Sequence, residues 1–141
     1  MPSSSASAVA PARMARVHED DDLVRVDADL LRPGEACGPG SVWARVRIPL
    51  VEGEETSPIP RLAIVVDSTN GISGELPIAD WLFVPPTMSL TILRPPVGPW
   101  IHLAAETHLS GIGTVAAQGR VSDLDGPVAF VSRPLPVAPR R

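Results

Sequence analysis

The second half of the chain alternates apolar and polar side chains in four long segments, at residues 80–94, 99–109, 113–123 and 127–137. A period of two residues is typical of strands that bury one face, because successive side chains of a strand point to opposite sides. The separators RPPVGP, SGIG and DLDGP are rich in the glycine and proline of turns. We therefore expect an antiparallel sheet built from neighbouring strands.

One helix is expected before this sheet, within the sequence TSPIPRLAIVVDSTNGISG at residues 56–74. Ser57 suits the N-cap and Pro58 the first helical position. Residues 62–66 are apolar on nearly all sides of the helix, which predicts a buried helix. The helix is expected to end within the three residues before Gly71, which would be its C-terminal stop.

Earlier segments add strands and a leader. VWARVRIPL at 42–50 alternates as a half-buried strand does, and LVRVDADLL at 23–31 is a candidate first strand. Residues 1–13 are rich in Ser, Ala and Pro, so we expect a disordered leader followed by a folded domain over 14–141. A buried helix between an early strand and a run of antiparallel strands predicts an α+β fold, with the sheet wrapped around the helix.

The composition limits the class of protein. A length of 141 residues predicts one domain, and a hydrophobic share of 44% fits a globular chain. A net charge of −4 without a basic stripe argues against nucleic-acid binding. No run approaches the roughly 20 apolar residues of a membrane span, and the first residues do not resemble a secretory signal. We therefore expect a cytoplasmic protein that needs no cofactor.

Metal and disulfide sites are not expected. The acidic run HEDDD at 18–22 lacks a defined ligand spacing and is typical of a solvated loop. Cys37 is the single cysteine, which excludes an internal disulfide. His102 and His108 fall on the polar face of their strand, where exposed side chains are more common than metal ligands.

Two polar residues fall on apolar strand faces. Thr107 shares its face with Ile101, Leu103, Ala105 and Leu109, and Arg133 shares its face with Val131, Leu135 and Val137. A threonine can satisfy its hydroxyl on a neighbouring strand. A buried unpaired charge costs several kcal/mol, so Arg133 must find a carboxylate, an anion or water, or extend past the sheet edge.

In their order, these segments resemble the C-terminal hotdog domain of the double-hotdog acyl-CoA thioesterase-like family over about residues 42–137. The most specific shared pieces are D-x-x-N-G at Asp67, Asn70 and Gly71, RPPVGPW at 94–100 and D-x-D-G-P at 123–127. The resemblance implies a hotdog fold, in which an antiparallel sheet wraps around a central helix. It agrees with the layout expected from the alternation.

The resemblance also implies a site for hydrolysis. Its polar groups are an aspartate on the helix, a threonine on a strand and a glutamine on the last strand, which together activate a water against the thioester carbonyl. Asp67 and Thr107 match the first two, while Arg133 stands at the glutamine position. The expected catalytic set is therefore Asp67, Thr107 and Arg133. The expected substrate-binding residues are Asn70, Gly71 and Arg94, the last as a contact for pantetheine phosphates.

Two opposite electrostatic effects are expected to act on the Asp67 carboxylate. The negative end of the helix dipole and burial both favour the protonated carboxyl, as suits a general base. Arg133 opposite would hold the same carboxylate ionised and partly neutralised, which makes it a poorer base for water.

Three functions stay open from the sequence. The first is hydrolysis of an acyl-CoA or acyl-carrier-protein thioester. The second is a dehydratase- or cyclase-type tailoring reaction in polyketide biosynthesis, where an arginine would bind an enolate or carboxylate. The third is a non-catalytic acyl-binding subunit that pairs with another hotdog chain. Because one hotdog leaves a sheet edge uncovered, we expect a homodimer with the acyl tunnel at its interface.

Overall fold

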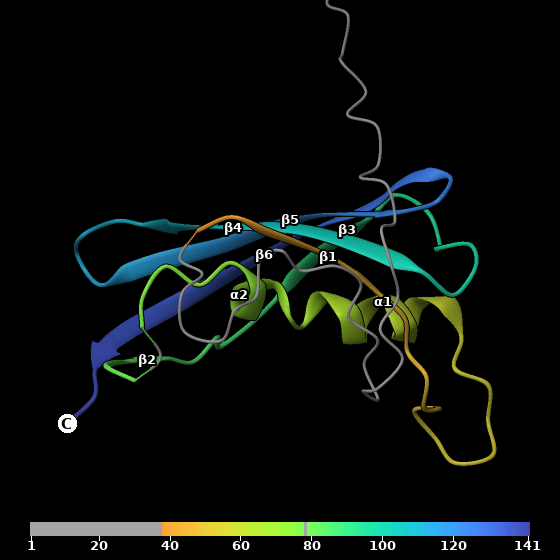
Figure 1. Ribbon diagram of the computed structural model, residues 1–141, viewed down its shortest axis with the longest axis horizontal. Helices are drawn as coiled ribbons and strands as arrows, with labels where there is room; N and C mark the ends of the chain where they lie inside the picture. Colours follow the sequence, from red (N-terminus) through yellow and green to blue (C-terminus); the bar gives the residue numbers. More distant parts are fainter. Residues whose placement is uncertain (1–37, 78) are drawn as a thin grey trace, which may run out of the picture.

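The computed structural model describes residues 38–77 and 79–141. They form a curled antiparallel sheet with two helices against one face (Figure 1). The strands are β1 (Gly40–Ala44), β2 (Trp81–Phe83), β3 (Ser89–Ile92), β4 (Ile101–Leu109), β5 (Thr114–Asp123) and β6 (Gly126–Pro139). The helices are α1 (Pro58–Val66) and α2 (Thr69–Ile72). The strand order is β1-β4-β5-β6-β2, and β3 also pairs with β6.

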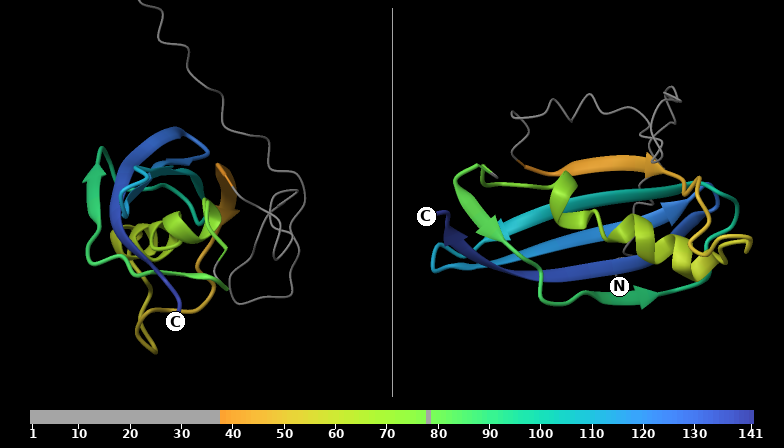
Figure 2. Two further views of the ribbon diagram at one scale, coloured as in Figure 1. Left: turned by 90° about the vertical axis from the view of Figure 1, so that its left-hand side faces the viewer. Right: turned by 90° about the horizontal axis from the view of Figure 1, so that it is seen from below.

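The helices lie across the concave side of the sheet, with β1 at one edge and β3 at the other (Figure 2). This arrangement confirms the predicted α+β layout of a sheet wrapped around a helix. The core fills the space between α1 and the sheet, where the fully buried Leu62, Val65 and Val66 meet apolar residues of β1, β4, β5 and β6. No helix within the described ranges is long and apolar enough to cross a membrane.

Two predicted strands differ from the observed ones. The segment expected over 80–94 divides into β2 and β3, because Pro85 and Pro86 lie between them and proline cannot join a ladder. The strand expected over 42–50 ends at Ala44. Its outer part is solvent-exposed, with Ile48 at 55% and Leu50 at 63%. The predictions for residues 1–13, 18–22, 23–31 and Cys37 concern residues outside the described part of the chain.

The helix begins as predicted, with Pro58 in the first turn after Ser57. It ends earlier than predicted, because Asp67 is already the C-cap of α1. The chain then turns and forms the short helix α2, which contains Gly71. Gly71 is therefore not a helix stop, and the expectation that it ends the helix is wrong.

The outer face of the sheet also buries side chains near β1. Trp43 and His102 pair across β1 and β4, with ring centroids 4.9 Å apart and relative exposures of 4% and 8%. Trp100 packs against Trp43, and the Arg45 guanidinium lies 5.1 Å from the centre of the Trp100 ring. Burial lowers the pKa of His102. The expectation of an exposed His102 is therefore wrong.

Candidate functional site

The sheet register brings Thr107 and Arg133 onto one row across three strands. Thr107 of β4 pairs with Ala117 of β5, and Ala117 pairs with Arg133 of β6. Directly paired residues point to the same face, and the contacts of Thr107 with Ser73 and of Arg133 with Asp67 show that this is the face that carries the helices. With about 4.8 Å between neighbouring strands, the Cα atoms of Thr107 and Arg133 are roughly 10 Å apart.

Arg133 reaches from this row to the end of α1. Its Nη2 lies 3.1 Å from Oδ1 of Asp67, and its Nη1 donates to the backbone carbonyl of Asp67. The side chain of Arg133 is 9% exposed and that of Asp67 is 73% exposed. The cation on the apolar face has therefore found a carboxylate, and it does not extend past the sheet edge. The buried Nε of Arg133 has no hydrogen-bond partner among the described residues.

Asp67 differs from the sequence-based picture in its exposure. The sequence predicts that both the helix dipole and burial act on this carboxylate, yet its side chain lies at the surface of the single chain. Its position follows from the early end of α1, which leaves Asp67 as the C-cap at the turn into α2.

Thr107 contacts a residue that the sequence did not indicate. Its Oγ1 lies 2.7 Å from Oγ of Ser73, directly after α2, and Ser73 is fully buried. Ser73 also donates to the backbone carbonyl of Thr69, at 2.8 Å. A helix of four residues leaves no visible apolar period, so no sequence pattern indicated this contact.

A narrow cavity opens beside Thr107, between α2 and the sheet. Its volume is about 20 Å³, which is room for about one water molecule. Asn70, Glu75 and Thr107 supply polar side chains, and most other lining residues are apolar: Leu76, Phe83, Leu109, Val115, Leu135 and Val137. Thr107 and Asn70 are thus brought together. The cavity as it stands is too small for an acyl chain.

Arg94 lies away from this site. Its guanidinium binds Asp123 through both nitrogens, at 2.7 Å to Oδ2 and 2.6 Å to Oδ1. Asp123 is six residues from Ala117 along β5, or roughly 20 Å. A contact between Arg94 and the substrate stays a prediction, and in the described structure Arg94 has a structural partner.

The Arg94–Asp123 pair joins two of the motifs in the sequence, RPPVGPW and D-x-D-G-P. The buried Asp123 also accepts hydrogen bonds from the backbone N–H groups of Val97 and Asp125, at 2.8 and 2.9 Å. The hydrogen bonds from Arg94, assisted by these backbone donors, lower the pKa of Asp123 to about 2 against the opposing effect of burial. The two motifs therefore hold the segment after β3 against the end of β5, and we call this contact the Arg94–Asp123 corner.

Gly71 is solvent-exposed and does not line the cavity. A methyl group added at its Cα would meet no atom within 4 Å. Its assignment as a substrate-binding residue stays a prediction.

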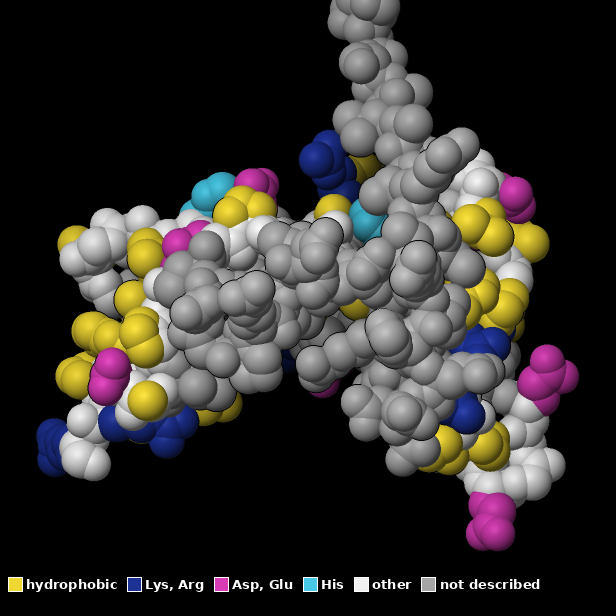
Figure 3. Space-filling model, in the orientation of Figure 1, with side chains coloured by type: hydrophobic (Ala, Val, Ile, Leu, Met, Phe, Trp, Pro, Cys, Tyr) yellow, Lys and Arg dark blue, Asp and Glu magenta, His cyan; other side chains and the backbone are white. Residues whose placement is uncertain are grey.

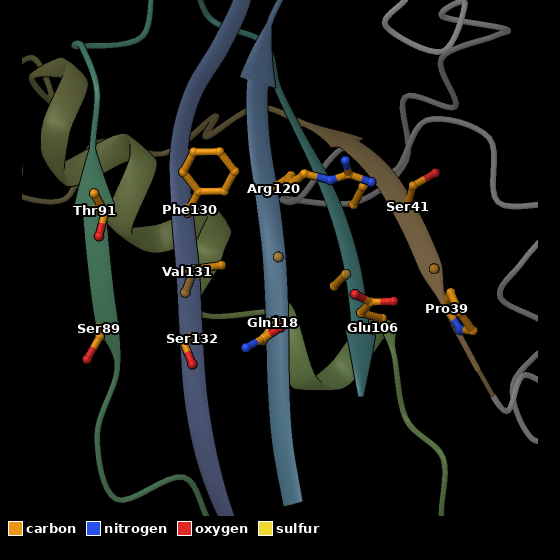
Figure 4. Close-up of a pocket in the computed structure, with 14 residues that line it drawn as sticks. Pro39, Ser41, Ser89, Thr91, Glu106, Gln118, Arg120, Phe130, Val131 and Ser132 are labelled. Carbon is orange, nitrogen blue, oxygen red and sulfur yellow. The ribbon is translucent and has the colours of Figure 1, made fainter. Parts of the chain in front are cut away.

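A larger hollow, of about 770 Å³, lies on the outer face of the sheet, away from the helices (Figure 4). Side chains of Arg120, Gln118, Phe130 and Glu106 stand around it. It is separated by the sheet itself from Asp67, Thr107 and Arg133. We place the candidate site on the concave side because the buried Arg133 with its carboxylate partner and the hydroxyl pair of Thr107 and Ser73 both lie on that side of the sheet.

The described residues contain no group of three or more His, Cys, Asp or Glu side chains that could hold a metal ion. The polar groups on the concave side of the sheet are the Asp67 carboxylate, the hydroxyls of Thr107 and Ser73, the Asn70 amide and the Arg133 guanidinium. Such groups can bind and activate water or polarise a carbonyl.

A family model identifies the family to which this chain belongs. The family model described as the acyl-CoA thioesterase C-terminal domain matches residues 6–135. The chain belongs to this family. A search of curated proteins gives no match.

Solved structures resemble this thioesterase-family domain in fold. The acyl-CoA thioesterase II TesB2 from Mycobacterium marinum is 22% identical with a TM-score of 0.59, over 84% of this chain and 49% of that chain. BH2602 from Bacillus halodurans, solved with CoA, is 19% identical with a TM-score of 0.51, over 70% of this chain and 66% of that chain. A mutant of thioesterase PA1618 from Pseudomonas aeruginosa is 13% identical with a TM-score of 0.58, over 84% of this chain and 82% of that chain.

These likenesses confirm the hotdog fold of the family domain. The chain spans about half the length of the M. marinum enzyme and two thirds of BH2602.

Proposed function

We propose that this chain hydrolyses an acyl thioester, carried by CoA or by an acyl carrier protein, through a water activated beside Asp67. The observation that carries the proposal is the meeting of Asp67 with Arg133, on the strand row that also holds Thr107. Family membership supports the same chemistry.

In the proposed reaction, the water oxygen attacks the thioester carbonyl carbon and the carbon–sulfur bond breaks. Asp67 accepts one proton of the water and returns it to the departing sulfur, so the products are a carboxylic acid and a thiol. Arginine has donors and no acceptor, so Arg133 cannot accept a hydrogen bond from water as a glutamine can. We assign it instead to the carbonyl oxygen, where a donor stabilises the negative charge that develops.

We propose that the active form is a homodimer in the cytoplasm, where CoA and carrier-protein thioesters are handled. Asp67 is largely exposed in the single chain, and the cavity beside Thr107 does not hold an acyl chain, so a second copy would enclose the site. Among the described strands, β3 pairs only with β6 and leaves one edge open. Exposed apolar side chains in or directly after β2 and β3 include Leu82, Val84 and Leu93.

The test is substitution of the proposed base. Asp67→Asn should lower the rate of thiol release from acyl-CoA esters by roughly 10²–10⁴-fold, the usual contribution of a general base. Asp80→Asn, at another exposed aspartate, is the matched control and should keep the wild-type rate. Equal rates for wild type and Asp67→Asn, with both proteins folded, would remove Asp67 from the mechanism.

One observation favours a second candidate, the binding of an anionic or enolate ligand as in a tailoring enzyme for polyketide-like substrates or an acyl-binding subunit. The Nε of Arg133 is buried without a partner among the described residues, and a ligand oxygen would satisfy it. Ligand binding without thiol release from any acyl-CoA ester would favour this candidate.

A further inference from the structure

The hydrogen bonds around Ser73 fix the direction of the bond to Thr107. A serine hydroxyl has a single proton to donate. Ser73 gives it to the backbone carbonyl of Thr69, which can only accept, at 2.8 Å. Ser73 must therefore accept from Thr107, whose Oγ1 lies 2.7 Å away. The proton of Thr107 points toward Ser73.

The backbone of the turn holds this chain of hydrogen bonds in place. Thr69 is fully buried and donates its own hydroxyl to the carbonyl of Val66, the last residue of α1, at 2.5 Å. Ser73 is also fully buried. Both hydroxyls are thus enclosed, and rotation of either would leave a buried carbonyl without its partner, at a cost of about 1–3 kcal/mol.

We propose that Ser73 is a positioning residue that turns Thr107 into a hydrogen-bond acceptor toward the nucleophilic water. This inference rests on the proposed hydrolysis. With its proton committed to Ser73, Thr107 offers only lone pairs on its free side, next to a cavity with room for about one water.

The direction of this bond gives Asp67 and Thr107 different roles toward the water. Water gives one proton to Asp67, which removes it, and points the other at Thr107, which holds it without taking it. The lone pair of the water oxygen is then free to attack the carbonyl carbon. Thr107 cannot donate to the carbonyl oxygen, so that contact falls to Arg133.

A double-mutant cycle tests whether Ser73 acts through Thr107. Ser73→Ala should lower kcat for acyl-CoA hydrolysis about tenfold, the equivalent of one hydrogen bond, with little change in KM. Thr107→Val should also lower kcat, and adding Ser73→Ala to it should cause no further loss. In Thr107→Ser, which keeps the hydroxyl, Ser73→Ala should again lower kcat. Ser132→Ala, on the outer face of the same sheet, is the control.

Several outcomes would overturn the inference. If Ser73→Ala lowers kcat by the same factor with and without the Thr107 hydroxyl, Ser73 does not act through Thr107. An unchanged kcat in Ser73→Ala has the same meaning. A wild type without hydrolysis would instead overturn the proposed function, so the two failures are distinguishable.

A neutron structure of the wild-type protein in D₂O gives a readout that depends on neither activity nor mutant folding. The deuterium of Thr107 should lie between the two hydroxyl oxygens on the Thr107 side, and that of Ser73 should point to the Thr69 carbonyl. A Thr107 deuterium directed into the cavity would contradict the proposal even if every variant behaved as expected.

Discussion

Arg133 is a residue at which this chain departs from the family pattern that the resemblance implies. It stands where the resemblance places a glutamine, and its contacts with Asp67 keep the carboxylate in an ion pair. The Asp67 oxygen that contacts the Arg133 guanidinium is less free to accept a hydrogen bond from water. The arginine can therefore slow general-base catalysis while it supplies a donor for the carbonyl oxygen.

Arg133→Gln separates these two effects. If the ion pair restrains Asp67, the variant should hydrolyse simple acyl-CoA esters faster than wild type, because the glutamine can help to hold the water and Asp67 is released. Steady-state thiol release is the measurement. Arg120→Gln, on the outer face, is the charge-matched control and should leave the rate unchanged.

A different result for Arg133→Gln would favour the second candidate, the binding of an anionic or enolate ligand. If Arg133→Gln leaves hydrolysis at background and weakens ligand binding by about 1–3 kcal/mol, Arg133 holds an anionic group of the ligand. If neither rate nor binding changes, Arg133 takes no part in the site.

Asp123 predicts how the fold responds to acid. Its pKa is lowered from 3.8 to about 2 by the hydrogen bonds from Arg94 and backbone N–H groups. A carboxyl with a lowered folded-state pKa stabilises the fold above its unfolded pKa, and this contribution is lost as the pH falls from about 4 toward 2. The lost free energy of unfolding should be about 2 kcal/mol.

Asp123→Asn should remove this acid-sensitive contribution. The variant should be less stable than wild type at pH 7, and its stability should change less between pH 4 and pH 2. Urea unfolding at a series of pH values is the measurement, with Asp80→Asn as the control. Parallel pH dependence for wild type and Asp123→Asn would contradict the account of this corner.

At the scale of the elements, the glycine of β1 sets how closely α2 approaches the sheet. A Cβ added at Gly40 would lie 2.1 Å from the backbone carbonyl oxygen of Ile72, at the end of α2. A backbone oxygen cannot move aside as a side chain can. The contact therefore fixes the position of α2, and with it Ser73 above Thr107.

Gly40→Ala should therefore destabilise the protein by about 1–3 kcal/mol, the usual cost of overpacking. Gly71→Ala is the matched control, because a Cβ there meets nothing within 4 Å and alanine favours a helix over glycine. Thermal unfolding should show a lower Tm for Gly40→Ala only. Equal Tm values for the two variants would mean that β1 and α2 can separate at little cost.

The elements that could be predicted from the sequence are those with a long and regular period. The long strands β4, β5 and β6 follow the alternation, and α1 begins at the expected Ser57–Pro58 signal. β2 and β3 were not predicted as separate strands, because the residues on both sides of Pro85 and Pro86 are β-like. Alternation alone does not show that the chain leaves one strand and enters another there.

The candidate site could be predicted from the sequence only in part. Asp67, Thr107 and Arg133 came from the family pattern, and the last two also stood out as polar residues on apolar faces. Ser73 was missed because α2 is too short to show a period. The burial of His102 depends on Trp43 of another strand, a tertiary contact that alternation within one strand does not contain.

At the scale of the whole molecule, the described chain exposes much apolar surface. Hydrophobic side chains gather at both ends of the face seen in Figure 3. The exposed large hydrophobic side chains of the described residues include Leu109 at 47% and Ile112 at 87% exposure, at the β4–β5 turn. Together with the open edge of β3, this surface supports the proposed homodimer.

Light scattering tests this assembly. We expect the mass of two chains at micromolar concentration, with the two sheets joined edge to edge. A stable monomer that still hydrolyses acyl-CoA would contradict the proposal that a second copy completes the site.

The central claim is that water, held by Asp67 and Thr107, attacks the thioester directly. A single turnover of an acyl-CoA ester in H₂¹⁸O, with enzyme in excess, tests it most directly by mass spectrometry of the released acid. Direct attack predicts one ¹⁸O atom in the acid and none in the protein. An unlabelled acid, with ¹⁸O incorporated at Asp67, would show that the carboxylate itself attacks and would contradict the account.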